Sequence, residues 1–336
     1  PLAEQVILIT GASSGIGLVT ARAAAAAGAQ VMLVARNEAA LADAVAGIRR
    51  DGGDAAYAVA DVGDAGQVRA AADAAIARFG RIDSWINNAG VAIYAKLVDT
   101  PIDEHARLFQ TNYFGAVNGA MAAIPHLRAR GGALITVGSI VSDIPTPIMG
   151  AYAASKHAVR GYIESLRIEI RADQLPISVT LIKPSGIDTP IARHAANHGD
   201  GEAMIPPPVY DPMLVADAIL YAAEHPRREI TVGGGGRAQA LFGTHFPRLL
   251  EKFAPRGIPA LFDTAKPKTP GNALFASAGG GEERSGDHSA RRTSLYTAGQ
   301  LHPAAAATIG IAVAAGIVAL FAWRAESGST PAPGQA

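Results

Sequence analysis

Residues 6–17, V-I-L-I-T-G-A-S-S-G-I-G, decide the fold. The first five residues form a continuous run of strand length, glycines follow at positions 11, 15 and 17, and an alanine-rich helical pattern continues to about Ala27. Glycines let a backbone approach a pyrophosphate closely, and a helix N-terminus offers unpaired N–H groups and partial positive charge. A strand, a glycine turn and a helix in this order indicate a dinucleotide-binding unit, with an ordinary tight turn as the alternative.

Strand and helix patterns alternate beyond this unit. Apolar runs predict further strands at 31–35, 55–60, 82–86, 133–137, 177–182 and 229–232, with helical patterns between most of them. Strands that alternate with helices form parallel sheets covered on both faces. We therefore predict an α/β fold with a Rossmann-type doubly wound parallel sheet of about seven strands.

A second informative stretch runs from Ser139 to Lys156, S-I-V-S-D-I-P-T-P-I-M-G-A-Y-A-A-S-K. Ser139 follows a predicted buried strand, and open α/β sheets keep their ligands at the ends of such strands. Tyr152 and Lys156 lie four residues apart on a helical pattern and so share one face. A fixed cation lowers the pKa of a neighbouring tyrosine, which then suits general acid–base chemistry. On spacing alone, a snorkelling lysine beside a half-buried ring is the commoner explanation.

The composition narrows the function classes. Lys and Arg number 29 and Asp and Glu number 29, so the chain lacks the basic character of a nucleic-acid-binding protein. Cysteine is absent from the sequence, which excludes disulfides and Cys-based metal or redox chemistry. His194 and His198 are four residues apart without an evident third ligand, so we predict no metal site. The chain runs almost directly from Pro1 into a strand, and we expect no signal peptide.

Arg36 follows the second predicted strand and bears on the choice of cofactor. In dinucleotide-binding folds the end of this strand faces the adenosine ribose, where an acidic residue binds the 2′-hydroxyl and an arginine accommodates a 2′-phosphate. The planar guanidinium matches phosphate with paired charge-assisted hydrogen bonds. The sequence therefore favours NADP over NAD, and a solvated loop charge is the alternative.

The order and spacing of these motifs resemble the short-chain dehydrogenase/reductase family over about residues 5–235. The matching motifs are 10–17 (T-G-A-S-S-G-I-G), 61–62 (D-V), 87–90 (N-N-A-G), Asn112, Ser139 and 152–156 (Y-A-A-S-K). The resemblance implies that Tyr152 is the catalytic acid/base and that Lys156 lowers its pKa and binds the nicotinamide ribose. It also implies that Ser139 orients and polarises a carbonyl and that Asn112 holds a water in a proton relay.

The same resemblance implies a set of cofactor-binding residues. Besides Tyr152 and Lys156, these are Gly11, Ser13, Ser14, Gly15, Ile16, Gly17, Arg36, Asp61, Val62, Asn88, Ala89, Gly90, Pro184, Gly186, Ile187 and Thr189. One departure is Ser185, because relatives usually have glycine directly after the proline. Since serine is small and a glycine follows it, we expect the nicotinamide contacts of Ile187 and Thr189 to be retained.

The chain divides into a catalytic domain and C-terminal additions. We predict an NADP-binding catalytic domain over residues 1–236, in which 190–211 form the substrate lid by resemblance to the family. Residues 237–264 form a C-terminal extension. Within it, residues 237–253 mix apolar and basic side chains and either lie on a membrane surface or pack over the substrate pocket. Residues 265–303 lack periodicity and predict a flexible linker.

Residues 304–323 contain no charged side chain and predict a transmembrane helix, followed by a disordered tail over 324–336. Twenty helical residues span about 30 Å, the thickness of a bilayer's hydrocarbon core. An alanine-rich helix docked on the enzyme is the alternative. Arg291 and Arg292 upstream outnumber Arg324 downstream, which favours a membrane-anchored protein whose catalytic domain is cytoplasmic.

The predicted function is NADP(H)-dependent interconversion of a carbonyl and an alcohol by hydride transfer, on a lipophilic small molecule. A catalytically silent, membrane-tethered NADP-binding sensor or scaffold is the alternative, although a binder has no need of a polarised phenol. The family resemblance also implies a homodimer or homotetramer, in which the helix carrying Tyr162, Leu166 and Ile170 packs against its symmetry mate.

Overall fold

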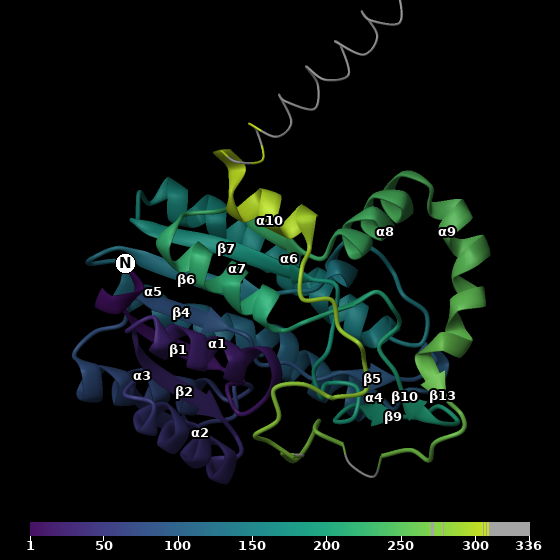
Figure 1. The fold of residues 1–336 in the computed structure, drawn as a ribbon, viewed down its shortest axis with the longest axis horizontal. Coiled ribbons are helices and arrows are strands. Elements are labelled where there is room, and N and C mark those ends of the chain that lie inside the picture. Colours follow the sequence, from purple (N-terminus) through teal and green to yellow (C-terminus); the bar gives the residue numbers. More distant parts are fainter. Residues whose placement is uncertain (270–271, 278, 305, 307, 309–336) are drawn as a thin grey trace, which may run out of the picture.

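The sheet places β1 at the point where its strand order reverses. A computed structural model describes residues 1–269, 272–277, 279–304, 306 and 308. Within these residues seven strands form a parallel sheet in the order β12–β7–β6–β4–β1–β2–β3 (Figure 1). Strand β1 (Val6–Thr10) pairs with β2 on one side and with β4 on the other. The predicted Rossmann-type parallel sheet is therefore confirmed.

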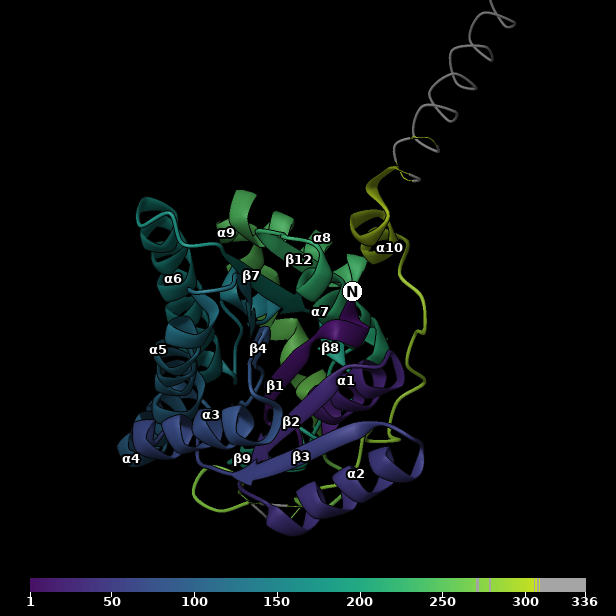
Figure 2. The same cartoon turned by 90° about the vertical axis from the view of Figure 1, so that its left-hand side faces the viewer.

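Helices cover both faces of the sheet, and this explains why its strands appear in the sequence as nearly continuous apolar runs. The other strands are β2 (Gln30–Ala35), β3 (Asp54–Val59), β4 (Ser84–Asn87), β6 (Gly132–Val137), β7 (Ile177–Pro184) and β12 (Glu229–Val232). One face carries α1 (Gly15–Ala26), α2 (Glu38–Arg50) and α7 (Met213–Glu224). The other carries α3 (Ala65–Phe79), α5 (Gly115–Leu127) and α6 (Gly150–Ala172) (Figure 2).

Shorter elements surround the carboxyl ends of the strands. They include α4 (Ile102–Phe109), a π-helical turn, η3 (Gln110–Phe114), and a 3₁₀ turn, η4 (Ile140–Ser142). Three two-residue strands lie within the predicted lid and pair outside it. These pairs are β9 (Ala196–Asn197) with β5 (Ile93–Tyr94), β10 (Glu202–Ala203) with β13 (Phe262–Asp263), and β11 (Val209–Tyr210) with β8 (Gly186–Ile187). The lid region is thus joined to the rest of the domain by three short strand pairings.

The first C-terminal addition folds into α8 (Gly234–His245), α9 (Pro247–Phe253) and a 3₁₀ segment, η5 (Ala254–Leu261). Gln239 and Leu261 border the central cavity described below, so part of this segment packs over the pocket. Its outer surface exposes Phe242, Phe246 and other large apolar side chains. Packing over the pocket is one of the two placements that the sequence left open, and contact with a membrane surface stays a prediction.

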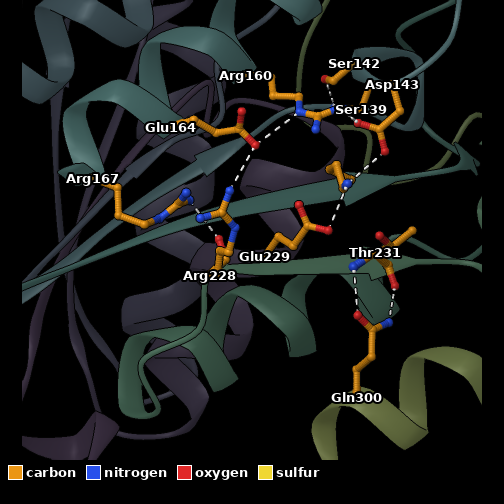
Figure 3. Close-up of polar contacts among 11 residues, drawn as sticks. Ser139, Ser142, Asp143, Arg160, Glu164, Arg167, Arg228, Glu229, Thr231 and Gln300 are labelled. Carbon is orange, nitrogen blue, oxygen red and sulfur yellow. Dashed lines mark hydrogen bonds and ion pairs between the residues drawn. The ribbon is translucent and has the colours of Figure 1, made fainter. Parts of the chain in front are cut away.

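The structure corrects the prediction of a flexible linker over residues 265–303. Residues 272–277 and 279–303 follow the surface of the domain and end in α10 (Leu295–Leu301), which docks beside β12 (Figure 1). The Gln300 amide donates to Thr231 O at 2.8 Å and accepts from Thr231 N at 3.2 Å (Figure 3). Polar residues without periodicity are held here by partners far away in the chain, and a linear pattern does not reveal such partners.

The predicted transmembrane helix over 304–323 lies outside the described residues, apart from 304, 306 and 308, and the predicted tail over 324–336 lies outside them entirely. Within the described part of the chain, no helix combines the length and apolar character needed to cross a membrane.

The packing of α6 against a symmetry mate stays a prediction, and the apolar residues of this helix divide between the protein's own core and the outer surface. Leu166 and Ile170 are 8% and 6% exposed and pack into the protein's own core. Tyr162 is partly buried and meets the ring of Tyr113 edge-on at 6.1 Å between centroids. Ile168, which is 72% exposed, is the large apolar side chain that α6 presents outward.

Candidate active site

One cavity of about 420 Å³ follows the carboxyl ends of the strands. It extends from Arg36, just beyond β2, to Ser139, just beyond β6, and crosses the place where the strand order reverses. All predicted site residues lie in the described part of the chain, and all except Gly17 and Asn112 border this cavity. Residues spread over 180 positions of sequence therefore meet at one edge of the sheet, as the resemblance implied.

The glycine turn is held tightly against the loop after β4. Gly11 has a φ of +67°, and a Cβ there would lie 2.7 Å from Ala89 Cα. The Asn88 amide donates to Thr10 O at 2.9 Å. A Cβ on Gly17 would lie 2.3 Å from Gly11 O, so Gly17 allows α1 to pack on the turn and does not line the cavity. The turn is thereby open to a ligand on one side only.

Tyr152 and Lys156 are brought together by α6, as their spacing predicted. The Lys156 ammonium is buried, donates to Val137 O at 2.9 Å and lies 5.7 Å from the centroid of the Tyr152 ring. Ser139 caps η4, where its hydroxyl accepts a hydrogen bond from Val141 N at 3.3 Å. A phenol, an ammonium and a hydroxyl group therefore converge at one end of the cavity.

Burial controls the protonation of this cluster. It raises the pKa of Tyr152 to about 12, against the opposing effect of a hydrogen bond with Ser139. It also lowers the pKa of Lys156 to about 8. The pKa of Tyr152 does not fall below its ordinary value as expected, because burial of the phenol outweighs stabilisation of the phenolate. At pH 7 the phenol is protonated and Lys156 is mostly charged.

A buried ion-pair network holds the loop that follows Ser139 (Figure 3). Asp143 accepts from Arg160 at 2.6 Å and from Lys183 at 2.8 Å, and Lys183 also pairs with Glu229 at 3.1 Å. Lys183 is only 2% exposed, so loss of Asp143 would leave a poorly compensated buried charge. The network joins η4, α6, β7 and β12 and thereby fixes the position of Ser139.

Asn112 lies in the π-helical turn, a feature that often accompanies functional sites. Its Oδ1 accepts from Val91 N at 2.8 Å, and its Nδ2 donates to Val91 O and to Ser155 Oγ, both at 3.0 Å. The side chain thus ties the loop after β4 to α6. The proton-relay role that the resemblance implied stays a prediction.

The opposite end of the cavity is closed by residues that the sequence did not indicate. The Arg36 guanidinium donates to Ala273 O at 2.5 Å and to Leu274 O at 3.2 Å. Arg107 pairs with Asp61 and also donates to Leu274 O, at 2.7 Å. Burial lowers the pKa of Arg36. Because these contacts use backbone carbonyls, which every residue has, the sequence carried no signal for them.

Ser185 is accommodated without disturbing the cavity. Its amide N–H donates to Val232 O at 2.9 Å, and its hydroxyl donates to Gly233 O at 3.0 Å. Ile187 and Thr189 follow it at the cavity wall. The side chain that replaces glycine therefore points toward β12 and α8.

The wall beyond Ser139 is mainly apolar. It is formed by Tyr94, Ile144, Met149, Ile191, Ile205 and Leu261, none of which the sequence marked as site residues. Their only signal was position within the segments after β4 and β6, the lid or the C-terminal extension. His194 also borders the cavity, whereas His198 pairs with Glu104 at 2.8 Å. The described residues contain no cluster of three or more His, Asp or Glu side chains that could hold a metal ion.

Fold and site together define a Rossmann-type α/β protein with a Ser–Tyr–Lys cluster at the switch point of its sheet. Residues 5–199 match the family model described as short chain dehydrogenase. The chain therefore belongs to the short-chain dehydrogenase family and is an oxidoreductase.

Two relatives differ in how much of the chain they share. The uncharacterized oxidoreductase YxnA of Bacillus subtilis is 42% identical over 324 residues, which cover 95% of this chain and 90% of that protein. Dehydrogenase/reductase SDR family member 7B of Bos taurus is 38% identical over 199 residues, which cover 57% of this chain and 61% of that protein. Since the alignment with YxnA omits about a twentieth of this chain, it extends over C-terminal residues that the family model does not match.

Two solved structures share the fold. A short chain dehydrogenase/reductase from Burkholderia phymatum, in complex with NAD, has a TM-score of 0.66 at 26% identity and covers 73% of this chain and 94% of its own. An alcohol dehydrogenase from Thermococcus sibiricus, complexed with 5-hydroxy-NADP, has a TM-score of 0.61 at 25% identity and covers 68% and 95%.

Proposed function

We propose that the protein transfers hydride between NADP(H) and a lipophilic carbonyl compound or alcohol. The observation that carries this proposal is a single cavity that joins Arg36 at one end to Ser139, Tyr152 and Lys156 at the other. The two solved relatives were determined with NAD and with 5-hydroxy-NADP, which supports a nicotinamide dinucleotide as the cofactor.

The chemistry follows from the protonation states of the cluster. When bound, NADPH supplies a hydride for the carbonyl carbon. Tyr152 is protonated at neutral pH and donates its proton to the carbonyl oxygen, while Ser139 donates a hydrogen bond to the same oxygen. The charged Lys156 stabilises the phenolate that remains. One hydride and one proton convert the carbonyl to the alcohol, and the oxidation reverses each step.

NADP is favoured over NAD by the cations at the adenosine end. Arg36 and Arg107 both reach the carbonyl oxygen of Leu274, and Asp61 is the acidic partner of Arg107. Two guanidinium groups near one carboxylate leave a net positive charge, which suits a 2′-phosphate better than a hydroxyl. A lipophilic substrate is favoured by the apolar wall around Ile144, Met149 and Leu261.

The test is to incubate the protein with NADPH and a panel of lipophilic ketones and aldehydes. The loss of NADPH absorbance measures turnover. We expect oxidation of NADPH with at least one ketone or aldehyde and slower reaction with NADH. Tight NADPH binding without turnover across the panel would instead support the silent sensor or scaffold.

We further propose that residues 304–323 anchor the protein in a membrane, with the catalytic domain on the cytoplasmic side. The described chain leaves α10 at the same end of the molecule as α8 in both views (Figures 1 and 2). Leu241 and Phe242 of α8, and Phe246 just after it, are 44%, 38% and 54% exposed. The full chain should stay with membranes through alkaline washing, while a version ending at residue 303 should be released. Release of the full chain by alkali alone would contradict the anchor.

We also propose a homodimer, or a homotetramer built from it, whose interface is formed by helices on the outer side of one sheet face. Phe114, Met121 and Ile168, on η3, α5 and α6, are 46%, 66% and 72% exposed and offer apolar side chains to a partner. Light scattering of the version ending at residue 303 should give a dimeric or tetrameric mass. Met121→Glu together with Ile168→Glu should shift that mass toward the monomer, and a monomer before substitution would contradict the proposal.

A further inference from the structure

Residues 272–277 and 279–287, here called the C-terminal strap, run along the outside of the cavity from Arg36 to the lid. We propose that the strap is part of the cofactor site: it closes over the adenosine half of the cofactor, so that cofactor exchange requires the strap to lift. The proposal rests on the nicotinamide cofactor assigned above and adds a role for a segment outside the family model, which ends at residue 199.

The strap begins by capping the cations of the adenosine end. Arg36 donates to the carbonyl oxygens of Ala273, Leu274 and Ala276, and Arg107 shares the oxygen of Leu274. These described contacts engage three of the five N–H groups of the Arg36 guanidinium. The strap therefore covers the side chain that is proposed to bind the 2′-phosphate, and it does so through main-chain oxygens.

The strap then crosses the glycine turn. The amide of Gly281 donates to Ser13 O at 2.7 Å, the amide of Gly15 donates to Glu282 O at 2.8 Å, and the Asn37 side chain donates to Gly279 O at 2.7 Å. Gly279 and Gly281 have φ values of +65° and +88°, which favour glycine at both bends. The main chain of the strap is thus bonded to the main chain of the nucleotide-binding turn.

The cavity continues beneath the strap and is not filled by it. Ala273, Ser277 and Gly279 border the same cavity as Ala35 and Asp61 on the opposite side. The strap is therefore an outer wall of the adenosine space. A cofactor beneath it would be enclosed between the strap and the ends of β2 and β3.

The far end of the strap is latched to the lid. Arg284 donates to both carboxylate oxygens of Asp211 at 2.9 and 2.8 Å, and Arg193 donates to Asp287 at 2.9 and 2.7 Å. Ser285 bonds to Asp188, which lies between two predicted nicotinamide contacts. The side chains of Arg193 and Arg284 are 29% and 37% exposed, so water can solvate both guanidinium groups when the latch opens, without unfolding of the domain.

The first test loosens the latch with Arg284→Ala combined with Asp287→Ala. The rate constant for NADPH dissociation, measured by displacement in a stopped-flow fluorimeter, should rise about tenfold or more, since loss of interface contacts acts mainly on dissociation. Arg78→Ala is the matched control, because it removes an exposed ion pair of 2.5 Å with Asp54 remote from the strap. A dissociation rate within twofold of the control would overturn the proposal.

The second test locks the strap and does not depend on weakening the fold. A Cβ on Gly280 would lie 2.6 Å from the Cβ of Ala40, so a disulfide between Ala40→Cys and Gly280→Cys needs a separation of about one ångström more. The chain has no cysteine of its own, so the bond can form in one way only. NADPH loaded before oxidation should stay bound through gel filtration and leave after reduction. Equal exchange by the oxidised and reduced protein would overturn the proposal.

Both tests measure binding and exchange without a substrate, and this separates them from the proposed function. Failure of the unmodified protein to bind either nicotinamide cofactor would overturn the proposed function and this inference together. If the unmodified protein binds NADPH normally, but neither the latch substitutions nor the disulfide changes the rate of NADPH exchange, only the proposed role of the strap would be overturned.

Discussion

The two ends of the cavity are built in opposite ways. At the reaction end, Ser139, Tyr152 and Lys156 lie within 18 consecutive residues, the first as the N-cap of η4 and the other two on α6. At the adenosine end, Arg36 meets residues 237 to 240 positions later in the chain. The first end is set by local helical and strand geometry, and the second is completed by long-range contacts to main-chain oxygens.

This difference means that the reaction and the exchange of cofactor depend on different ends of the cavity. The reaction end cannot open without disrupting α6, whose inner face is part of the core. The adenosine end can open over residues 279–287 by breaking hydrogen bonds and partly exposed ion pairs, while Leu274 anchors the start of the strap in a buried apolar cluster. Changes at one end should therefore leave the property governed by the other end largely untouched.

The largest expected effect is that of Tyr152→Phe, which breaks the reaction end alone. Removing the hydroxyl removes the proton donor, so kcat should fall by about 10³-fold, within the range known for general acid–base groups. The Kd for NADPH, measured by fluorescence titration, should change less than about threefold, well under one kcal/mol. Retention of more than a few per cent of kcat would show that Tyr152 is not the acid.

A second substitution acts on the adenosine end. Ala35→Asp with Arg36→Ala places a carboxylate where a 2′-phosphate is proposed to bind and removes one cation. The ratio of kcat/KM for NADPH to that for NADH should fall about 10- to 1000-fold, since each charge-assisted bond contributes about 1.5 to 3 kcal/mol. Arg36→Ala alone is the intermediate control. Equal kcat/KM for both cofactors in the unmodified protein would contradict the premise.

The pH dependence of stability tests the burial of Lys156. Its pKa is about 8 in the folded protein against 10.5 in the unfolded chain, so between these values the unfolded chain binds more protons and stability rises with pH. Between pH 7 and 9.5 this rise should be about 2 kcal/mol. Tyr152 adds nothing in this window, because its raised pKa acts only above pH 10. Lys156→Met should lack the rise when urea unfolding is compared at both pH values.

The smallest expected effect concerns the stability of α6, the helix that carries Tyr152 and Lys156, and leaves the cavity unchanged. Gly161 lies on the exposed face of α6, and a Cβ there would have nothing within 4 Å. Gly161→Ala should raise the free energy of unfolding by about 0.5 to 1 kcal/mol, because alanine is the better helix former. Kinetic constants should be unchanged. Gly17→Ala is the opposite case and should destabilise the protein, since its Cβ would overlap Gly11 O.

What the sequence predicted and what it missed follow the same division. Buried parallel strands and the spacing of Tyr152 from Lys156 are local patterns, so the sheet and the reaction end could be predicted. The apolar positions Leu166 and Ile170 were recognised, but periodicity does not say whether a face meets its own core or a partner. The pKa of Tyr152 was expected to fall because one charge was considered without the burial of both groups.

The strap could not be predicted, because its contacts carry no side-chain signature. Apart from Leu274 and Phe275 its residues are small, polar or charged, and its bonds to Ser13, Gly15 and Arg36 use main-chain groups on the strap side. Composition alone indicates a linker there. Only the three-dimensional path of the chain distinguishes a linker from a wall.

The position of the strap in the chain also has a consequence for biosynthesis. Every strand of the seven-stranded sheet lies before residue 233, whereas the strap begins at residue 272. A ribosome therefore delivers the complete sheet and its nucleotide-binding turn before it delivers the wall that encloses them. Because domains generally fold as their N-terminal parts emerge, the nascent enzyme passes through a stage with an open cofactor site, which closes once the strap has been translated and has left the ribosome.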